Sequence, residues 1–499
     1  MSQNADNPPS SEHPESDLNE SEGMIQSGKL AGKSMWSGIW ILALPVLLQQ
    51  MLVASVGLVD KMLGGSLPES IVIPAMDGLS IGSYIGWFIS IAMTGLGIGG
   101  QALIARAMGA NDSATSHQAL GTAIVLAFVW GIFVAGALWF IIEPLCHLVK
   151  LDPEAIQFAV QYVHAMAWSM PFCSVMMVGS MCLYGAGETT LPSIIAAGSN
   201  IINVAASWLL SGVEIRFGES RIPNPSPLDP ALWGVKGIAM GTAIAWVFGA
   251  AVVLLVLFRG VKDLSLLPST LKPHREMSWR IVRIGVPTFI EGVSMWLANF
   301  FVLRFIGDIA SQMGGEADLQ QGLQGSHIIA IQWESFSFLP GFAMGTAAGA
   351  LAGQYLGAGN VRLARKAMLS CTLVAILIMG TLGIIFMVFG ETLTRIISDQ
   401  PSHINTLPQL LFICGATQIF FATTMVVRQG LRGVGDTRWT LIITTISSYG
   451  VRLPLAWWLG VHLELGLTGI WIALCGEIMV RAFLFLARFL HGGWARVRV

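Results

Sequence analysis

Four acidic residues lie inside long apolar stretches of this sequence, namely Asp60, Asp77, Glu291 and Glu334. A charge at the centre of a membrane-spanning helix costs about 2.5–3.5 kcal/mol, so such residues usually face a cavity or a partner and mark the path of an ion or proton. These carboxylates are therefore candidates for binding a coupling cation or a cationic substrate. The alternatives are interfacial or helix-capping roles for the two Asp residues and neutral, hydrogen-bonded side chains for the two Glu residues.

Glu291 and Glu334 are predicted to lie at a similar depth on adjacent helices. Glu291 lies ~12 Å along its helix from Arg283, and Glu334 lies ~10–11 Å from His327 on a helix that runs the other way. Two carboxylates at close range favour sharing a proton. The resulting hypothesis is competition: an ionised carboxylate attracts a cationic substrate, and protonation or sodium binding releases it.

A second set of residues is predicted to line or support the substrate cavity. Asn203 could hydrogen-bond a substrate or an ion, although a packing contact between helices is an equal alternative. Arg452 could pair with an acid or extend its side chain to the membrane surface. The candidate cavity-lining residues are Gln49, Trp296 and Trp333. Ordinary helix packing is the alternative for the aromatic residues.

Structural roles are predicted for the remaining polar groups. Glu477 and Arg481 lie one helical turn apart, which favours an intrahelical ion pair. The six Cys and nine His residues are scattered without the spacing of metal ligands. We therefore predict no catalytic residues, no bound metal and no cofactor, with H+ or Na+ as the coupling ion and the position of any Na+ site left open.

The elements that must position these residues are long apolar helices. Of 499 residues, 54% are hydrophobic and only 11% are charged, with a mean hydropathy of +0.68. Average soluble proteins contain about 25% charged residues, and ~20 apolar residues suffice to cross a bilayer as a helix. The sequence thus predicts an all-α polytopic membrane protein. Twelve transmembrane helices are expected over 36–63, 70–105, 115–142, 155–183, 190–212, 232–259, 281–305, 324–354, 363–391, 405–430, 437–461 and 465–490.

Charge in the loops predicts the orientation and the boundaries. Most of the 27 Lys and Arg residues fall on the side that holds the N-terminus, including clusters after the sixth, eighth and tenth helices. Since positive loops stay in the cytoplasm, both termini are expected there. The predicted parts are a disordered acidic tail (1–33), an N-terminal six-helix lobe (34–260), a linker loop (261–280), a C-terminal six-helix lobe (281–490) and a short tail (491–499).

The sequence repeats itself between the two predicted lobes. Gly185-Ala-Gly-Glu-Thr recurs as Gly433-Val-Gly-Asp-Thr, at a spacing of 248 residues (433 − 185) that also separates Gly109 from Gly357. An even number of helices in each half makes the two halves parallel, related by an axis along the membrane normal. Two such bundles would face each other across a central cavity, where a transported substrate usually binds.

Several short motifs resemble those of one transporter family in order and spacing. They are Leu44-Pro45, Gly57-Leu-Val-Asp60, Ala105-Arg-Ala-Met-Gly109-Ala, Gly185-Ala-Gly-Glu-Thr189, Asn200-Ile-Ile-Asn203, Gly353-Gln-Tyr-Leu-Gly357-Ala, Leu431-Arg-Gly-Val-Gly-Asp-Thr437 and Arg452-Leu-Pro454. Together they resemble the multidrug and toxic compound extrusion (MATE) family from about Trp36 to Leu490. Features around Glu291 and Glu334 look nearer to its prokaryotic DinF-like branch than to the NorM type.

The resemblance implies a two-lobe antiporter that exports organic, often cationic, compounds in exchange for protons or sodium ions. Two positions depart from the family's cation sites. Many relatives carry an Asp four residues after the Asn of the fifth helix, where this sequence has Ser207, and NorM-type members carry an Asp in the tenth helix at the place of Phe421. These departures leave open which ion drives transport.

Other functions remain as alternatives. A lipid-linked oligosaccharide flippase would need a strongly cationic cavity, whereas the candidate residues here are mostly acidic. A membrane enzyme would need a nucleophile or metal cluster, and no H-E-x-x-H motif is present. Two glycine-rich motifs, Gly78-Leu-Ser-Ile-Gly82 and Gly95-Leu-Gly-Ile-Gly99, follow no strand and are interpreted as close helix contacts. The expected setting is a bacterial inner membrane, with a monomer acting on small organic cations or metabolites and no nucleic acid.

Overall fold

The computed structural model describes residue 25 and residues 29–148, 152–217, 220–272, 274–312, 317–397 and 400–497. Nearly all of them are helical. The helices are α1 (Met35–Gly65), α2 (Val72–Gly109), α3 (Ser113–Leu148), α4 (Pro153–Ala167), α5 (Met170–Gly185), α6 (Thr190–Ser211), α7 (Pro230–Arg259), η1 (Pro268–Leu271), α8 (Arg275–Gln312), α9 (Ala317–Gly357), α10 (Val361–Val388), α11 (Gly390–Ile397), α12 (Pro401–Gly433), α13 (Thr437–Ser447), η2 (Ser448–Arg452), α14 (Leu453–Leu455), η3 (Ala456–His462), α15 (Gly466–His491) and η4 (Gly493–Arg496).

Within these described ranges, ten helices are long and apolar enough to cross a membrane, and α4 with α5 makes an eleventh span bent by 59°. The bend falls just before Pro171, which lacks a backbone N–H and interrupts the helical hydrogen bonding. The expected helix over 437–461 is a continuous run through α13, η2, α14 and η3, none of which reaches 18 residues. Counted as one interrupted helix, this run completes the predicted twelve.

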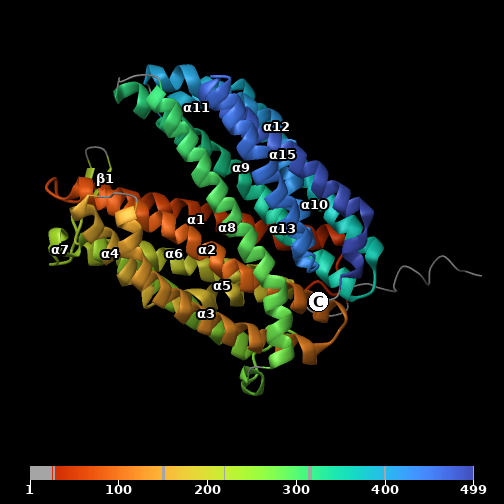
Figure 1. Cartoon of the computed structure of the whole chain (residues 1–499). Coiled ribbons are helices and arrows are strands. Elements are labelled where there is room, and N and C mark those ends of the chain that lie inside the picture. Colours follow the sequence, from red (N-terminus) through yellow and green to blue (C-terminus); the bar gives the residue numbers. More distant parts are fainter. Residues whose placement is uncertain are drawn as a thin grey trace, which may run out of the picture.

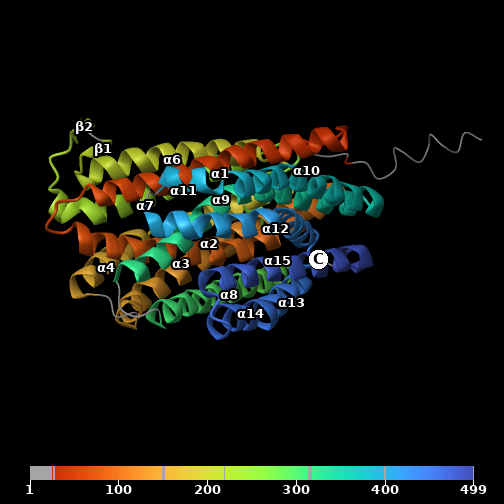
Figure 2. The ribbon, with the colours of Figure 1, turned by 90° about the horizontal axis from the view of Figure 1, so that it is seen from above.

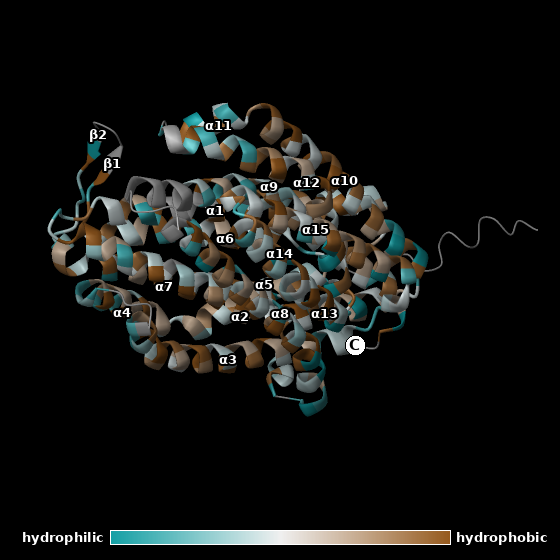
Figure 3. Cartoon of the chain, turned by 45° about the horizontal axis from the view of Figure 1, so that its top comes forward, coloured by the Kyte–Doolittle hydropathy of each residue, from teal (hydrophilic) through white to brown (hydrophobic). Residues whose placement is uncertain are grey.

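The helices form two bundles that diverge from a common end. Figure 1 shows α1–α7 in one bundle and α9–α15 in the other, meeting near the C-terminal residues and separating towards β1 and α11. Figure 2 shows α8 beside α13 and α15, with which it is in contact. Hydrophobic residues predominate along the helices in Figure 3, as expected for surfaces that face lipid.

α8 belongs to the second half of the sequence but packs lengthwise on α2 of the first half. Gly95 of α2 meets Gly285 and Phe289 of α8, and Gly99 meets Ile281. A side chain at Gly99 would collide with the α8 backbone and one at Gly95 would make a tight contact, so glycine at these positions permits the close approach of the helices. The prediction that this glycine-rich motif makes close helix contacts is confirmed.

The ends of the chain are more ordered than predicted. Ile25 and Leu30, inside the predicted tail 1–33, are buried in an apolar cluster with α1 and α9; residues 1–24 and 26–28 lie outside the described ranges. Trp494, inside the predicted tail 491–499, is 1% exposed and stacks on Phe489. α8 begins at Arg275 and takes up residues 275–280 of the predicted linker.

One element of the fold is not helical. Strands β1 (Ile215–Phe217) and β2 (Ser220–Ile222) pair antiparallel between α6 and α7, with Ile215 opposite Ile222. The sequence analysis assigned this segment to a loop, because three-residue strands leave no periodic pattern.

Candidate functional site

Asp60 is a partly buried acidic residue of the first bundle that has no ion pair among the described residues. It lies near the end of α1 and is partly buried, and its Oδ1 atom is buried with no hydrogen-bond partner. Tyr162 of α4, itself buried, is close enough to interact electrostatically with Asp60. No Lys, Arg or His among the described residues pairs with this carboxylate within 4.0 Å. A buried carboxylate in this state is costly unless a proton or a cation joins it.

Asp77 is placed differently from Asp60. It lies in the second turn of α2 and its side chain is exposed. The fold does not enclose this carboxylate, so the structure gives it no specific need for a bound proton or cation. Asp77 is therefore the weaker of the two candidates that the sequence proposed in this part of the molecule.

Asn203 of α6 offers a second unpaired oxygen in the first bundle. Its Nδ2 donates to Thr242 Oγ1 of α7 over 2.8 Å, which fixes the amide and leaves Oδ1 buried with no partner. Gln49 of α1 is instead satisfied, since its Oε1 accepts hydrogen bonds from Tyr184 (2.8 Å) and Ser193 (3.2 Å). Gln49 thus ties α1 to α5 and α6, whereas Asn203 retains a free acceptor.

Glu291 of α8 is fully buried and held by two arginines. Its Oε2 lies 2.8 Å from Arg432 Nη2 and its Oε1 lies 3.8 Å from Arg428 Nη1, both on α12. Thr440 and Thr444 of α13 donate to the two carboxylate oxygens over 2.9 and 2.8 Å. The site that a coupling cation would need is therefore filled by guanidinium and hydroxyl groups of the chain.

Arg428 and Arg432 belong to the basic cluster that was predicted to follow the tenth helix, and the structure places both of them within that helix. α12 runs to Gly433, so both side chains project from its last two turns towards the buried Glu291. Arginines near the end of an apolar run look like the basic residues of a cytoplasmic loop, which is why the sequence did not show that they lie inside the helix. The spacing of four residues, repeated in Thr440 and Thr444, was the available signal that each pair shares one helix face.

Arg452 takes part in a second buried network around Glu477. Its Nη2 lies 2.8 Å from Glu477 Oε2, and its Nη1 donates to Asn299 Oδ1 of α8 over 2.8 Å. Arg481 Nη2 lies 2.6 Å from Glu477 Oε1, which confirms the intrahelical pair expected from the sequence. Arg481 also donates to Ser447 and Ser448. The last residue of the π-helical turn η2 thus links α8 to α15.

Glu291 and Glu334, the carboxylates predicted to share a proton, have different charged neighbours. Glu291 faces the arginines of α12, whereas Arg452 is the charged group that acts on Glu334 of α9. Matching depth along two helices does not fix their rotation, and the two side chains point to different neighbours. Glu291 is thus paired with arginines, whereas Glu334 has a charged neighbour but no ion pair.

The two tryptophans proposed for the cavity lie on different helices. Trp296 of α8 stands against Tyr84 of α2, with ring centroids 5.0 Å apart, and so bridges the two bundles. Trp333 of α9 lies 6.0 Å from Phe336 of the same helix. The Nε1 atoms of both are buried and unpartnered, so each indole carries a hydrogen-bond donor that a polar ligand could use.

The two bundles join at the last turns of α2 and α9, a region we name the junction (105–109 and 353–357). Gly109 lies against the Gln354 backbone, and Gly357 lies against the Arg106 backbone. These contacts exchange when the 248-residue spacing of the sequence repeat is applied. The junction therefore sits on the pseudo-twofold axis that the repeat predicted.

Polar contacts at the junction follow the same symmetry to within one residue, because Gln354 is equivalent to Arg106 but Gly185 is equivalent to Gly433 and not to Val434. Gln354 Nε2 donates to the Gly185 carbonyl over 2.8 Å, and Arg106 Nη2 donates to the Val434 carbonyl over 2.8 Å. Arg106 Nη1 also donates to the Val497 carbonyl over 2.7 Å. One side chain of each bundle thus binds a backbone carbonyl of the other bundle, at the C-terminal end of α5 or directly after α12.

The acids of the repeated motif are also matched. Glu188 pairs with Lys29 over 3.0 Å, and Asp436 pairs with Arg488 over 2.8 Å. Beyond the junction, Asp112 and Asn360 cap α3 and α10 by accepting from the Thr115 and Leu363 amides. Hydrogen bonds from Thr115 hold the pKa of the Asp112 carboxyl below its ordinary value.

Comparison with known proteins decides the family. A family profile described as MatE matches residues 45–209 and again residues 287–458, once in each half of the chain. The chain belongs to the MATE family. The double match confirms the recognised family and agrees with the internal repeat. The expected nearness to the DinF-like branch stays a prediction.

Several relatives and solved structures resemble this MATE protein over most of its length. The chain is 29% identical over 91% of its residues to a probable multidrug resistance protein NorM of Thermotoga maritima, covering 92% of that protein. It is 24% identical over 87% of its residues to the multidrug resistance protein PmpM of Pseudomonas aeruginosa, covering 89% of it. A transporter of the MOP superfamily from Pyrococcus furiosus shares the fold, with a TM-score of 0.81, 19% identity and coverage of 96% and 99%.

The two departures from the MATE cation sites are packed positions in this structure. Ser207 is fully buried and donates to the Ile238 carbonyl of α7 over 3.1 Å. Phe421 of α12 stacks on Phe338 of α9, with ring centroids 4.5 Å apart. Neither position supplies an acid, so the buried carboxylates of this MATE protein are Asp60, Glu334 and those paired with arginines.

We expect Gly109→Val to open the junction of this MATE protein. The new side chain would meet the Gln354 backbone and push α2 away from α9, and overpacking of this kind costs about 1–3 kcal/mol. Spin labels at Ala114 and Arg362 should report a longer distance between the bundles by electron paramagnetic resonance. Gly136→Val is the control, because no other part of the protein lies within 4 Å of a Cβ at that position, the adjoining residues and the backbone of its own helix aside. An unchanged label distance in Gly109→Val would contradict the prediction.

Proposed function

We propose that this MATE protein is a secondary active antiporter that exports organic, mostly cationic, drugs or metabolites in exchange for protons or sodium ions. Membership of the family and the multidrug resistance names of its relatives support the class of activity. We also propose that it acts as a monomer in a bacterial inner membrane with both termini in the cytoplasm. Rocking of the two bundles about the junction would give alternating access to a site between them.

The observation that carries the proposal is the unequal distribution of charge between the bundles. Glu291 and Glu477 each pair with two arginines, and Glu334 has Arg452 as a charged neighbour without an ion pair. Asp60 has no cationic partner in the described part of the chain, and one of its oxygens has no hydrogen bond. A carboxylate already neutralised by the chain cannot exchange an external ion without breaking its own pairs. Asp60 is therefore the proposed coupling residue.

The proposed cycle follows from the state of Asp60. When the first bundle is open to the low-concentration side of the coupling ion, Asp60 is ionised and favours a cationic substrate in the same bundle. When that bundle is open to the other side, a proton or sodium ion binds Asp60, removes its negative charge and releases the substrate. The free oxygen of Asn203 supports the site as a neutral ligand for an ion or a substrate ammonium group.

A transport assay tests the proposal directly. Purified protein in liposomes loaded with ethidium is given a proton gradient, and separately a sodium gradient, and the initial rate of dye movement is measured. We expect movement under one of the two gradients, which also identifies the coupling ion. No movement of several cationic dyes under either gradient would contradict the proposal and direct attention to anionic or lipid-linked substrates.

A further inference from the structure

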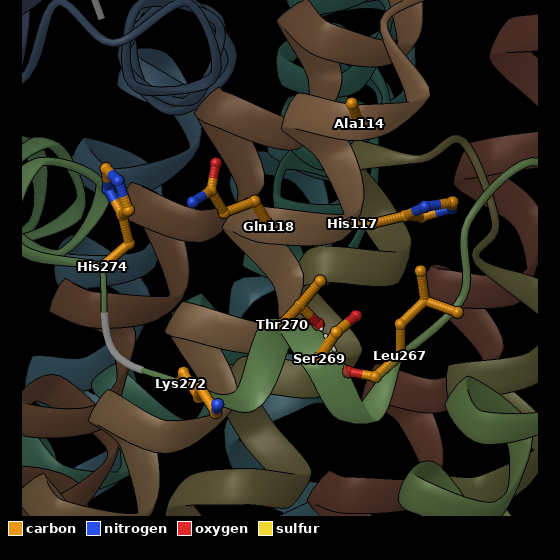
Figure 4. Close-up of a pocket in the computed structure, with 8 residues that line it drawn as sticks. All are labelled: Ala114, His117, Gln118, Leu267, Ser269, Thr270, Lys272 and His274. Atoms are coloured by element: carbon orange, nitrogen blue, oxygen red, sulfur yellow. Dashed lines mark hydrogen bonds between the residues drawn. The ribbon is translucent and has the colours of Figure 1, made fainter.

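The segment that connects the two lobes forms a pocket against the start of α3. This pocket of about 650 Å³ is lined by residues of α3, of η1 and of the chain leading into α8, as Figure 4 shows. The residues are Ala114, His117, Gln118, Leu267, Ser269, Thr270, Lys272 and His274. It lies where the spanning helices α3 and α8 begin, so it is at the level of the membrane surface.

The lining of this pocket is rich in hydrogen-bond donors and basic groups. Lys272 and His274 are exposed, and Ser269 and Gln118 add a hydroxyl and an amide. His117 is not available to a ligand in the same way, because its Nε2 lies 3.1 Å from the Asp263 carbonyl. This contact holds the segment between α7 and η1 against α3. A cation with several neutral donors around it matches the chemistry of a phosphodiester.

A second pocket of about 850 Å³ shares His274 with the first and extends it along α8. Its lining includes Arg275 and Trp279, together with one acid, Glu276. Below it, α8 presents apolar side chains on an outer surface, with Trp279 64%, Val286 45% and Ile290 46% exposed. The spacing of these residues places them on one helical face. Basic groups at the membrane surface therefore continue directly into a face that contacts lipid chains.

We propose that the two pockets together bind one anionic phospholipid. Lys272, His274 and Arg275 would hold the phosphate, Ser269 and Gln118 would hydrogen-bond the headgroup, and the acyl chains would lie along the α8 face at Trp279 and Val286. Basic pockets between transmembrane helices at the cytoplasmic surface are known to accept such headgroups. A soluble phosphate compound would make no use of the apolar face, so the lipid is the ligand that fits the whole site.

This lipid would act on the hinge between the lobes. The segment 260–274 joins α7 of the first bundle to α8, and α8 packs on both bundles. A lipid that bridges η1, α3 and the start of α8 would hold the connecting segment at a fixed depth while the bundles move. The proposal does not depend on the identity of the transported substrate.

The test measures lipid retention by the full chain in native mass spectrometry. Protein in detergent is titrated with phosphatidylglycerol or phosphatidylcholine, and Lys272→Gln/Arg275→Gln is compared with Arg221→Gln/Lys236→Gln. The second variant also removes two positive charges, but at exposed positions around the β1–β2 hairpin and α7, so it is the matched control. We expect retention of phosphatidylglycerol to weaken about fivefold for each charge removed from the pockets. The control variant should retain this lipid as strongly as the unaltered protein does.

Three outcomes would overturn the proposal. The first is equal retention of the two lipids by the unaltered protein. The second is an equal loss of phosphatidylglycerol from both double variants, because that would show only a general effect of charge. The third is displacement of the lipid by inorganic phosphate at millimolar concentration, which would assign the pocket to a soluble anion. Circular dichroism of each variant confirms that the helices are intact.

Discussion

Asp60→Asn is expected to abolish ion-driven export while leaving the protein folded. The amide keeps the size of the side chain but cannot take up and release a proton, and it binds sodium less strongly than a carboxylate. We expect the initial rate of gradient-driven dye movement to fall by about tenfold or more, in line with the functional role of intramembrane acids. Because the variant replaces an unpaired buried carboxylate with a neutral group, its thermal unfolding midpoint should be unchanged or raised.

Asp77→Asn provides the matched control for this prediction. It makes the same chemical change on the adjacent helix α2, but at an exposed side chain. Its export rate should stay within about twofold of the unaltered protein, since exposed polar substitutions have small effects. If Asp60→Asn still exported dye at the normal gradient-driven rate, the prediction would be wrong and the coupling site would not be on α1. Equal loss in both variants would indicate that surface charge, and not a specific site, drives substrate binding.

Glu477→Gln is expected to be among the most destabilising single changes in the second bundle. Glu477 is fully buried and accepts from both Arg452 and Arg481. Removing its charge leaves two guanidinium groups without a counter-ion, and breaking a buried pair in this way costs about 3–5 kcal/mol. The measurement is the midpoint of thermal unfolding in detergent, at neutral pH, where the carboxylate of the unaltered protein is paired.

Glu391→Gln tests whether burial causes this effect. Glu391 also pairs with an arginine, Arg395, over 2.8 Å and at a spacing of four residues, but their side chains are 62% and 53% exposed. Exposed pairs of this kind contribute about 0.2–1 kcal/mol, so the midpoint should hardly move. If Glu477→Gln and Glu391→Gln shifted the midpoint equally, the second network would be a minor contributor to stability.

The sequence predicted the helices and their duplication well, because both depend on local patterns. Apolar runs such as 363–391 and 465–490 correspond closely to α10 and α15. The repeated glycine motifs predicted a symmetric arrangement, and Gly109 and Gly357 lie at equivalent places on the axis. A glycine at a close helix contact can be recognised without knowing which helix it meets.

The partners of the buried charges could not be predicted in the same way. Glu291 was recognised as important, but its neighbours Arg432 and Thr444 come from α12 and α13, more than 140 residues away. Which face of a span turns towards which neighbour depends on packing between helices, and a continuous apolar run gives little information about rotation. Asp60 was proposed on the same grounds as Glu291, and only the structure distinguishes the unpaired acid from the paired one.

The bond between Arg106 and the Val497 carbonyl has a consequence for how the protein is made. Arg106 and Val497 are separated by 391 residues, so the first lobe emerges from the ribosome and enters the membrane long before its partner carbonyl exists. Domains generally fold as units during synthesis, starting from the N-terminus. The guanidinium of Arg106 therefore gains this acceptor late in synthesis, after the contacts that α2 makes with α8 and α9 can already join the two halves.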